Sequence, residues 1–133
     1  NGIKTLIVGS GADELFCGYA EFEKYRGDSN GCEKLRKEKV QNVEEHDVQR
    51  EKKCGEYYGI TLQAPYLDTA FAREALKIPA AHNLHGKYGK IRKNVLRTLA
   101  FQMKVPLEIV EAPKKAMQYG SGAHQLLQKK HHG

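Results

Sequence analysis

Tryptophan is absent from the 133 residues, and cysteine, proline and methionine are scarce, at three, four and two copies. No apolar run approaches the roughly 20 residues that a membrane-spanning helix needs, and the first residues lack a signal-peptide pattern, which argues against an integral membrane protein. The odd set of Cys17, Cys32 and Cys54 has no zinc-ribbon spacing. It therefore argues against a disulfide framework or a structural metal site and favours a reducing, cytoplasmic setting.

Charge is plentiful but unevenly distributed. Lys and Arg number 22 against 16 Asp and Glu, a net charge of +6, and a hydrophobic fraction of 40% suffices for the core of one domain. Residues 1–25 carry more acid than base, whereas residues 86–130 hold most of the surplus base. Aromatic residues are not interleaved with Arg as on a stacking platform. The pattern suits a site for metal plus phosphate as readily as a nucleic-acid groove, and we do not expect nucleic acid as the partner.

Hydrophobic periodicity predicts one clear strand followed by helices and leaves residues 56–64 ambiguous. The run Ile3–Val8 is apolar, rich in β-branched residues and followed by glycines, which is typical of a buried parallel strand. Asp68 is the predicted N-cap of a helix, and a loop is predicted at residues 112–115. The segment 33–53 is predicted to be helical, with a possible interruption. The other predicted helices cover residues 12–25, 69–78, 90–103, a short stretch from residue 106, and 123–130.

A single strand cannot form a buried parallel sheet, because its backbone groups need partners on both edges. We therefore expect residues 1–133 to be the C-terminal portion of a larger α/β domain. The rest of the sheet would come from the same gene or from a partner chain.

The segment between the strand and the first helix carries the chemistry. Glycines such as Gly9 and Gly11 let backbone N–H groups approach phosphate oxygens, and a carboxylate such as Asp13 is a hard oxygen ligand suited to Mg²⁺. A plain strand-to-helix turn, with Asp13 and Glu14 placed favourably in the first helical turn, explains the spacing equally well. Spacing alone leaves both interpretations open.

Four segments resemble, in the same order, segments of a known protein family, and this resemblance favours the phosphate and metal site over a plain turn. Residues 9–19 resemble the Ser-Gly-x-Gly-Ala-Asp-Glu-Leu-Phe-Gly-Gly-Tyr segment of asparagine synthetases. Residues 64–68 are similar to the family's Val-Pro-Phe-Leu-Asp, residues 93–97 to its Lys-x-x-Leu-Arg, and residues 113–117 to its Arg-Pro-Lys loop. The chain is thus identified as a member of this family, from its C-terminal half.

The resemblance implies a mostly helical part of a doubly wound parallel-sheet domain of the ATP-pyrophosphatase group. Such an enzyme activates an amino-acid carboxylate as acyl-AMP, releases pyrophosphate and passes the acyl group to a nitrogen nucleophile, with ATP and Mg²⁺ as cofactors. By residue match, Asp13 would bind the metal, Glu14 would support it or shape the loop, and Lys114 would stabilise the leaving pyrophosphate. The nucleotide would also touch Gly9, Ser10, Gly11 and Tyr19, while Lys93 and Arg97 would be structural or phosphate-facing.

The chain also departs from the family pattern. The ATP-gripping Ser-Gly-Gly-x-Asp-Ser loop and the glutaminase domain are not in these residues, Ser10 stands where the family has Glu, and Thr61-Leu62-Gln63 replaces its Glu-x-Arg. Two alternatives therefore stand beside the ligase: a non-catalytic nucleotide-binding or regulatory homologue and, ranked last, an RNA-modifying relative.

The carried-over site makes a geometric prediction. Asp13 and Lys114 should face each other across roughly 6–12 Å, the span of a metal–phosphate unit.

Overall fold

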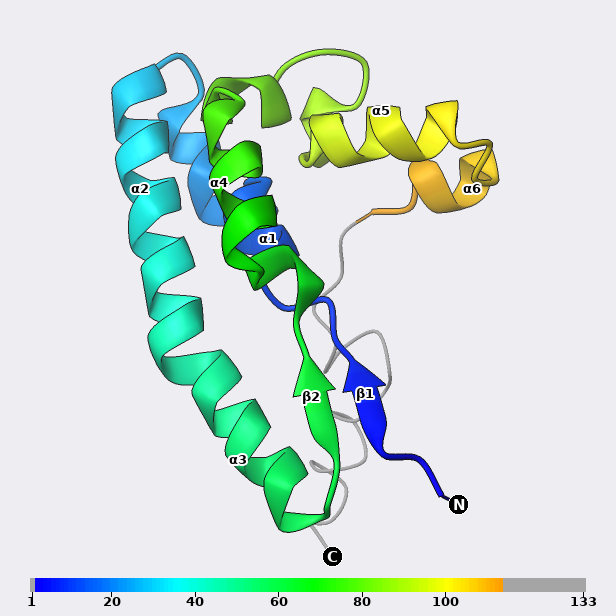
Figure 1. The fold of residues 1–133 in the computed structure, drawn as a ribbon. Coiled ribbons are helices and arrows are strands. Elements are labelled where there is room, and N and C mark those ends of the chain that lie inside the picture. Colours follow the sequence, from blue (N-terminus) through cyan, green and yellow to red (C-terminus); the bar gives the residue numbers. More distant parts are fainter. Residues whose placement is uncertain (1, 114–133) are drawn as a thin grey trace, which may run out of the picture.

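Two short parallel strands lie beside a set of helices in the computed structural model, which describes residues 2–113 (Figure 1). Strand β1 (Thr5–Ile7) pairs with β2 (Thr61–Gln63), with Leu6 opposite Leu62. The predicted strand is confirmed in shortened form. Strand β2 falls in residues 56–64, which the sequence left unassigned, because a strand of three residues is too short to show a periodicity. The side chains of β1 are exposed, whereas a buried strand was predicted.

The predicted single helix over residues 12–25 is broken. Helix α1 (Ala12–Leu15) is followed by a reversal at Cys17, whose φ of 53° lies in the left-handed region, and then by a 3₁₀ helix, Ala20–Tyr25. The N–H of Gly18 donates to the carbonyl of Asp13 at 2.7 Å and closes the turn. The periodicity suggested a continuous helix because both pieces bury apolar side chains.

The charged segment forms one long helical rod. Helix α2 (Ser29–Asn42) passes through a π-helical turn (Val43–Val48) into α3 (Gln49–Tyr57). Its start at Ser29 precedes the predicted one, because the Asp28 carboxylate accepts from the N–H of Gly31 at 2.9 Å and caps the helix. Val43 and Val48 are both buried, so the wider turn keeps residues five apart on the inner face.

Helix α4 (Thr69–Lys77) confirms the helix predicted from residue 69, and it follows a 3₁₀ turn at Pro65–Leu67. Asp68 is its N-cap: one carboxylate oxygen accepts from the N–H groups of Ala70 and Phe71 at 3.0 and 3.1 Å. At the other end, the buried Arg36 guanidinium of α2 donates to the carbonyls of Leu76 and Ile78 at 3.0 and 2.8 Å. This arginine joins α4 to the long rod.

The last described helices are α5 (Asn94–Gln102) and α6 (Leu107–Val110), after 3₁₀ turns at Ala80–Asn83 and Gly89–Ile91. Helix α5 begins later than predicted because Arg92 and Lys93 have positive φ angles of 61° and 53°. No helix within residues 2–113 combines the length and apolar character needed to cross a membrane.

The core consists of two clusters of buried side chains. The first joins α1 to α2 and α4 through Leu15, Phe16, Val40 and Ala75, and the second lies between the 3₁₀ segments and the start of α2. All three thiols are free, those of Cys17 and Cys32 being buried in the second cluster, where burial raises the pKa of both. The predicted helix at 123–130 and residues 114–115 of the predicted loop lie outside the described residues.

Candidate functional site

The loop from Gly9 to Gly11 leaves the carboxyl end of β1 and leads directly into α1. Gly11 has a φ of 97°, and a Cβ at this position would lie 2.6 Å from the side chain of Leu67. A glycine is therefore required here by both conformation and space. The carboxyl ends of parallel strands are where α/β folds bind ligands, so the loop lies where a phosphate site is expected.

Asp13, the predicted metal ligand, forms an ion pair. Lys93 Nζ lies 2.9 Å from Asp13 Oδ1, although the two residues are 80 positions apart. Gly18 makes the approach possible, because a Cβ there would lie 1.9 Å from Asp13 Oδ1 and 2.4 Å from Lys93 Cε. Both side chains remain about one-fifth exposed. The pair is thus accessible from one side and enclosed on the other.

Glu14 makes a separate contact, with Tyr19. Its side chain is buried and accepts a short hydrogen bond from the hydroxyl of Tyr19. Burial, together with the bond to Glu14, raises the pKa of Tyr19 above its usual range. Lys39 lies 5.8 Å from the centre of the Tyr19 ring. This environment fits the loop-shaping role predicted for Glu14 better than direct metal binding.

Ser10 forms a long-range contact. Its hydroxyl donates to Glu51 Oε2 of α3 at 3.0 Å, so the middle of the glycine loop is joined to the long rod. Glu51 was not among the residues that the sequence identified, since a single acid in a charged helix carries no signal of its own.

Two arginines hold the segment that presents Lys93. Arg92 donates from Nε to the carbonyl of Gly18 at 2.9 Å, while Arg97 donates to the carbonyls of Arg92 and Ile91 at 2.9 and 3.4 Å and to that of Val110. Partial burial and the neighbouring Arg92 lower the pKa of Arg97. Arg97 thus acts as a structural brace that connects the Lys93 turn to the end of α6.

The structure brings together residues 9–14, 18, 19, 51 and 93, but Lys114 lies outside the described residues. The predicted separation of Asp13 and Lys114 therefore stays a prediction. The described chain ends at Pro113, three residues after the Val110 carbonyl that Arg97 binds.

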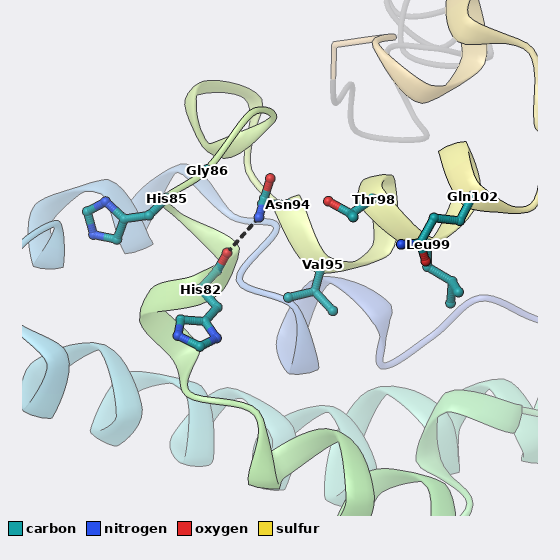
Figure 2. Close-up of a pocket in the computed structure, with 8 residues that line it drawn as sticks. All are labelled: His82, His85, Gly86, Asn94, Val95, Thr98, Leu99 and Gln102. Carbon is teal, nitrogen blue, oxygen red and sulfur yellow. Dashed lines mark hydrogen bonds between the residues drawn. The ribbon is translucent and has the colours of Figure 1, made fainter.

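A cavity of about 510 Å³ lies between the turn at residues 80–86 and α5 (Figure 2). Asn94 bridges its two walls, donating to the carbonyl of His82 at 3.1 Å and accepting from the N–H of Tyr88 at 3.0 Å. None of the predicted site residues lines this cavity. His82 and His85 have no third potential metal ligand near them in the described part of the chain.

Comparison with known proteins identifies the family. The model of the asparagine synthase family matches residues 27–132. The chain belongs to the asparagine synthase family. The family match begins after the Asp13 loop, but individual relatives extend further towards the N-terminus, one of them over 97% of the chain.

Three relatives show the extent of the similarity. "Putative asparagine synthetase (glutamine-hydrolyzing) 1" of Methanocaldococcus jannaschii is 33% identical over 97% of this chain and 29% of its own length. The root asparagine synthetase (glutamine-hydrolyzing) of Pisum sativum is 33% identical over 72% of this chain and 16% of its own. Asparagine synthetase B (glutamine-hydrolyzing) of Escherichia coli is 29% identical over 91% of this chain and 21% of its own length. The chain thus spans less than a third of each relative's length. No solved structure matches it significantly.

Proposed function

We propose that residues 1–133 are part of an ATP-dependent ligase that adenylates an amino-acid carboxylate and transfers the acyl group to a nitrogen nucleophile. The observation that carries the proposal is the Asp13–Lys93 pair at 2.9 Å, beside the glycine loop at the end of β1. One carboxylate and one ammonium group at such a loop are the charges that a metal–pyrophosphate unit requires. The family membership of the chain supports the same chemistry.

The chain would supply one half of the nucleotide site. We assign residues 1–133 to the C-terminal portion of a doubly wound ATP-pyrophosphatase domain, with the ATP-gripping loop and any glutaminase domain supplied by the same gene or by a partner chain. The exposed β1 supports this assignment. Leu6 and Ile7 are 48% and 67% exposed, and within residues 2–113 the strand pairs on one edge only.

The residues at Asp13 fit a magnesium ion. Asp13 provides a hard oxygen donor, and its ion pair with the Lys93 ammonium group supports the proposal of a cation at this carboxylate. Mg²⁺ held there would neutralise charge on the β- and γ-phosphates of ATP. Glu14, fixed by Tyr19, would keep the first turn of α1 in shape, and Gly9, Ser10, Gly11 and Tyr19 would border the nucleotide.

In the adenylation step, a carboxylate oxygen of the substrate bonds to the α-phosphorus while the bond from that phosphorus to the pyrophosphate oxygen breaks. Negative charge therefore accumulates on the leaving pyrophosphate. Lys93 would stabilise this charge after its ion pair with Asp13 breaks. We assign the same stabilising role to Lys114, in the loop predicted at residues 112–115. Arg92 and Arg97 would hold the backbone of Lys93 in place during this exchange.

A second candidate is a nucleotide-binding homologue without turnover. The observation that favours it is again the Asp13–Lys93 ion pair, because a lysine that stayed on Asp13 would exclude the metal. In this case ATP binding would persist without release of pyrophosphate.

The test uses the complete protein that contains these residues, incubated with ATP, Mg²⁺ and each amino acid in turn. Pyrophosphate release with one of them, reduced at least 100-fold in Asp13→Asn, is the expected result. Glu38→Gln, at an exposed position of α2, is the control and should retain the rate. ATP binding by calorimetry without release from any amino acid would support the second candidate.

A further inference from the structure

We propose that Glu23 is a positioning residue for the adenylation step, because it fixes the turn that presents Lys93 to Asp13. This inference rests on the proposed ligase function and adds to it a residue that no sequence motif identified. It starts from the ion pair between the Glu23 carboxylate and Arg92, the residue immediately before Lys93.

The turn before α5 is strained at two consecutive residues, Arg92 and Lys93. Arg92 has a φ of 61° and a ψ of 175°, a backbone conformation that is essentially confined to glycine, and Lys93 is left-handed, with a φ of 53° and a ψ of 35°. Such conformations are costly and persist only where surrounding contacts impose them. The contacts that hold Arg92 therefore decide where the Lys93 side chain starts.

Two contacts hold the Arg92 side chain, and both come from the segment that follows the Asp13 loop. Nε donates to the carbonyl of Gly18 at 2.9 Å, and Nη1 lies 3.5 Å from Glu23 Oε1. In the described part of the chain, Glu23 is the only acidic side chain paired with Arg92, and its Oε1 atom is buried and accepts no hydrogen bond. The Arg92 guanidinium is thus the charge that compensates this buried oxygen.

The other oxygen of Glu23 braces the approach to the same turn. Glu23 Oε2 accepts from Arg26 Nε and Nη2 at 3.0 and 2.6 Å. Arg26 in turn donates to the carbonyl of Leu84 and, at 3.1 Å, to that of Gly89, in the segment that leads into the strained turn. One carboxylate therefore ties the turn and the segment before it to the 3₁₀ helix Ala20–Tyr25.

This arrangement suits a lysine that must change partners. In the proposed step, Lys93 Nζ moves from Asp13 to the leaving pyrophosphate while its backbone stays in place. Among residues 2–113, Asp13 is the one acidic group within ion-pair distance of Lys93, so Glu23 holds the turn without competing for the ammonium group. Loss of the Glu23 charge would let the turn relax and misplace Nζ, which would lower kcat and leave KM for ATP nearly unchanged.

An ordinary surface ion pair is the competing explanation. The side chains of Glu23 and Arg26 are each about one-third exposed, and such pairs contribute little to stability. A purely structural pair would change the rate only through the fraction of folded protein, and this change would be the same with or without Lys93. A positioning residue acts through Lys93, so its effect should vanish once Lys93 has been replaced.

The experiment is a double-mutant cycle on the complete protein, with the amino acid that supports the strongest pyrophosphate release. The variants are Glu23→Gln, Lys93→Met and the two combined, and steady-state assays at saturating Mg²⁺ give kcat and KM for ATP. Urea denaturation checks that each variant is folded in the assay buffer. Glu74→Gln, which removes an exposed ion pair with Lys77 on α4, is the matched control.

For Glu23→Gln we expect kcat to fall by about 10-fold, with KM for ATP within about twofold of wild type. In the Lys93→Met background the same substitution should change kcat by less than about twofold, and Glu74→Gln should retain the wild-type rate. A further loss of about 10-fold in the double variant, or no loss in Glu23→Gln, would overturn the proposal. Absence of pyrophosphate release from the wild-type protein with every amino acid would instead refute the ligase function itself, and this inference with it.

Discussion

The Asp13 loop and the strand that leads into it differ sharply in how they are held. Side chains from α3, from the turn before α5 and from residues 66–67 bind or pack against the loop. Strand β1 pairs only with β2 among the described residues and leaves Ile7 exposed. The residues of this chain are thus sufficient to position the charged groups, whereas the sheet has an apolar surface suited to further structure.

The most severe test of the loop is Lys93→Met in the complete protein. Removing the ammonium group should lower pyrophosphate release by 10²–10³-fold, about 3–4 kcal/mol in transition-state stabilisation, because charge on the leaving group is then unopposed. Steady-state assays of pyrophosphate release measure this loss of rate. Lys90→Met, on an exposed turn nearby, should stay within twofold. An unchanged rate in Lys93→Met would assign Lys93 to structure alone.

The strand is tested by Ile7→Asp, again in the complete protein. If this side chain is covered there, the substitution removes an apolar contact and buries a charge, at a cost of at least about 2 kcal/mol in the free energy of unfolding. Urea denaturation measures it, with Lys53→Asp on exposed α3 as the control. A cost below about 0.5 kcal/mol would mean that β1 is a true edge.

Gly18→Ala tests how tightly the loop is packed. The added methyl would meet Asp13 Oδ1 and Lys93 Cε well inside contact distance, so the ion pair must shift, which should destabilise the fold by about 1–3 kcal/mol. Gly9→Ala is the matched control for stability, because nothing lies within 4 Å of a Cβ at that position. Thermal or urea unfolding measures the stability of both variants. Equal stabilities of Gly18→Ala and Gly9→Ala would show that the packing around Gly18 is loose.

Tyr19→Phe should have the smallest effect at neutral pH, about 1–2 kcal/mol, from loss of a hydrogen bond to a carboxylate. The pKa of Tyr19 is raised in the folded state, so the folded protein holds this proton more tightly than the unfolded chain. The wild type should therefore lose stability as the pH rises above about 10, where an unfolded tyrosine ionises. The variant should lose less. Urea denaturation at pH 7 and 10.5 compares them, and parallel losses would contradict the assignment.

Local signals predicted much of the fold. The N-cap at Asp68, the helix after Pro106 and a strand at the start of the chain follow from short-range rules that packing did not override. The break at Cys17 and the late start of α5 were not predicted. Both depend on positive φ angles at non-glycine residues, which are imposed by contacts between segments far apart in sequence.

The candidate site divides in the same way. The motif at residues 9–14 was visible in the sequence because its residues are contiguous. The pairing of Asp13 with Lys93 and of Ser10 with Glu51 was not, since each joins residues 80 or 41 positions apart. Such pairs become visible only once the fold has placed α3 and the turn before α5 against the loop.

The π-helical turn at Val43–Val48 has a consequence for how this rod tolerates changes in length. A π turn holds one residue more than an α turn over the same stretch of axis, so the surplus is taken up locally while the flanking helices keep their faces. A related chain lacking one residue in this turn could run straight from α2 into α3 and still present a glutamate to the serine of the loop. A second deletion between Val43 and Glu51, with no surplus residue left to absorb it, would turn that carboxylate away by about 100°. The π turn thus marks the place where the loss of one residue is compatible with an intact loop.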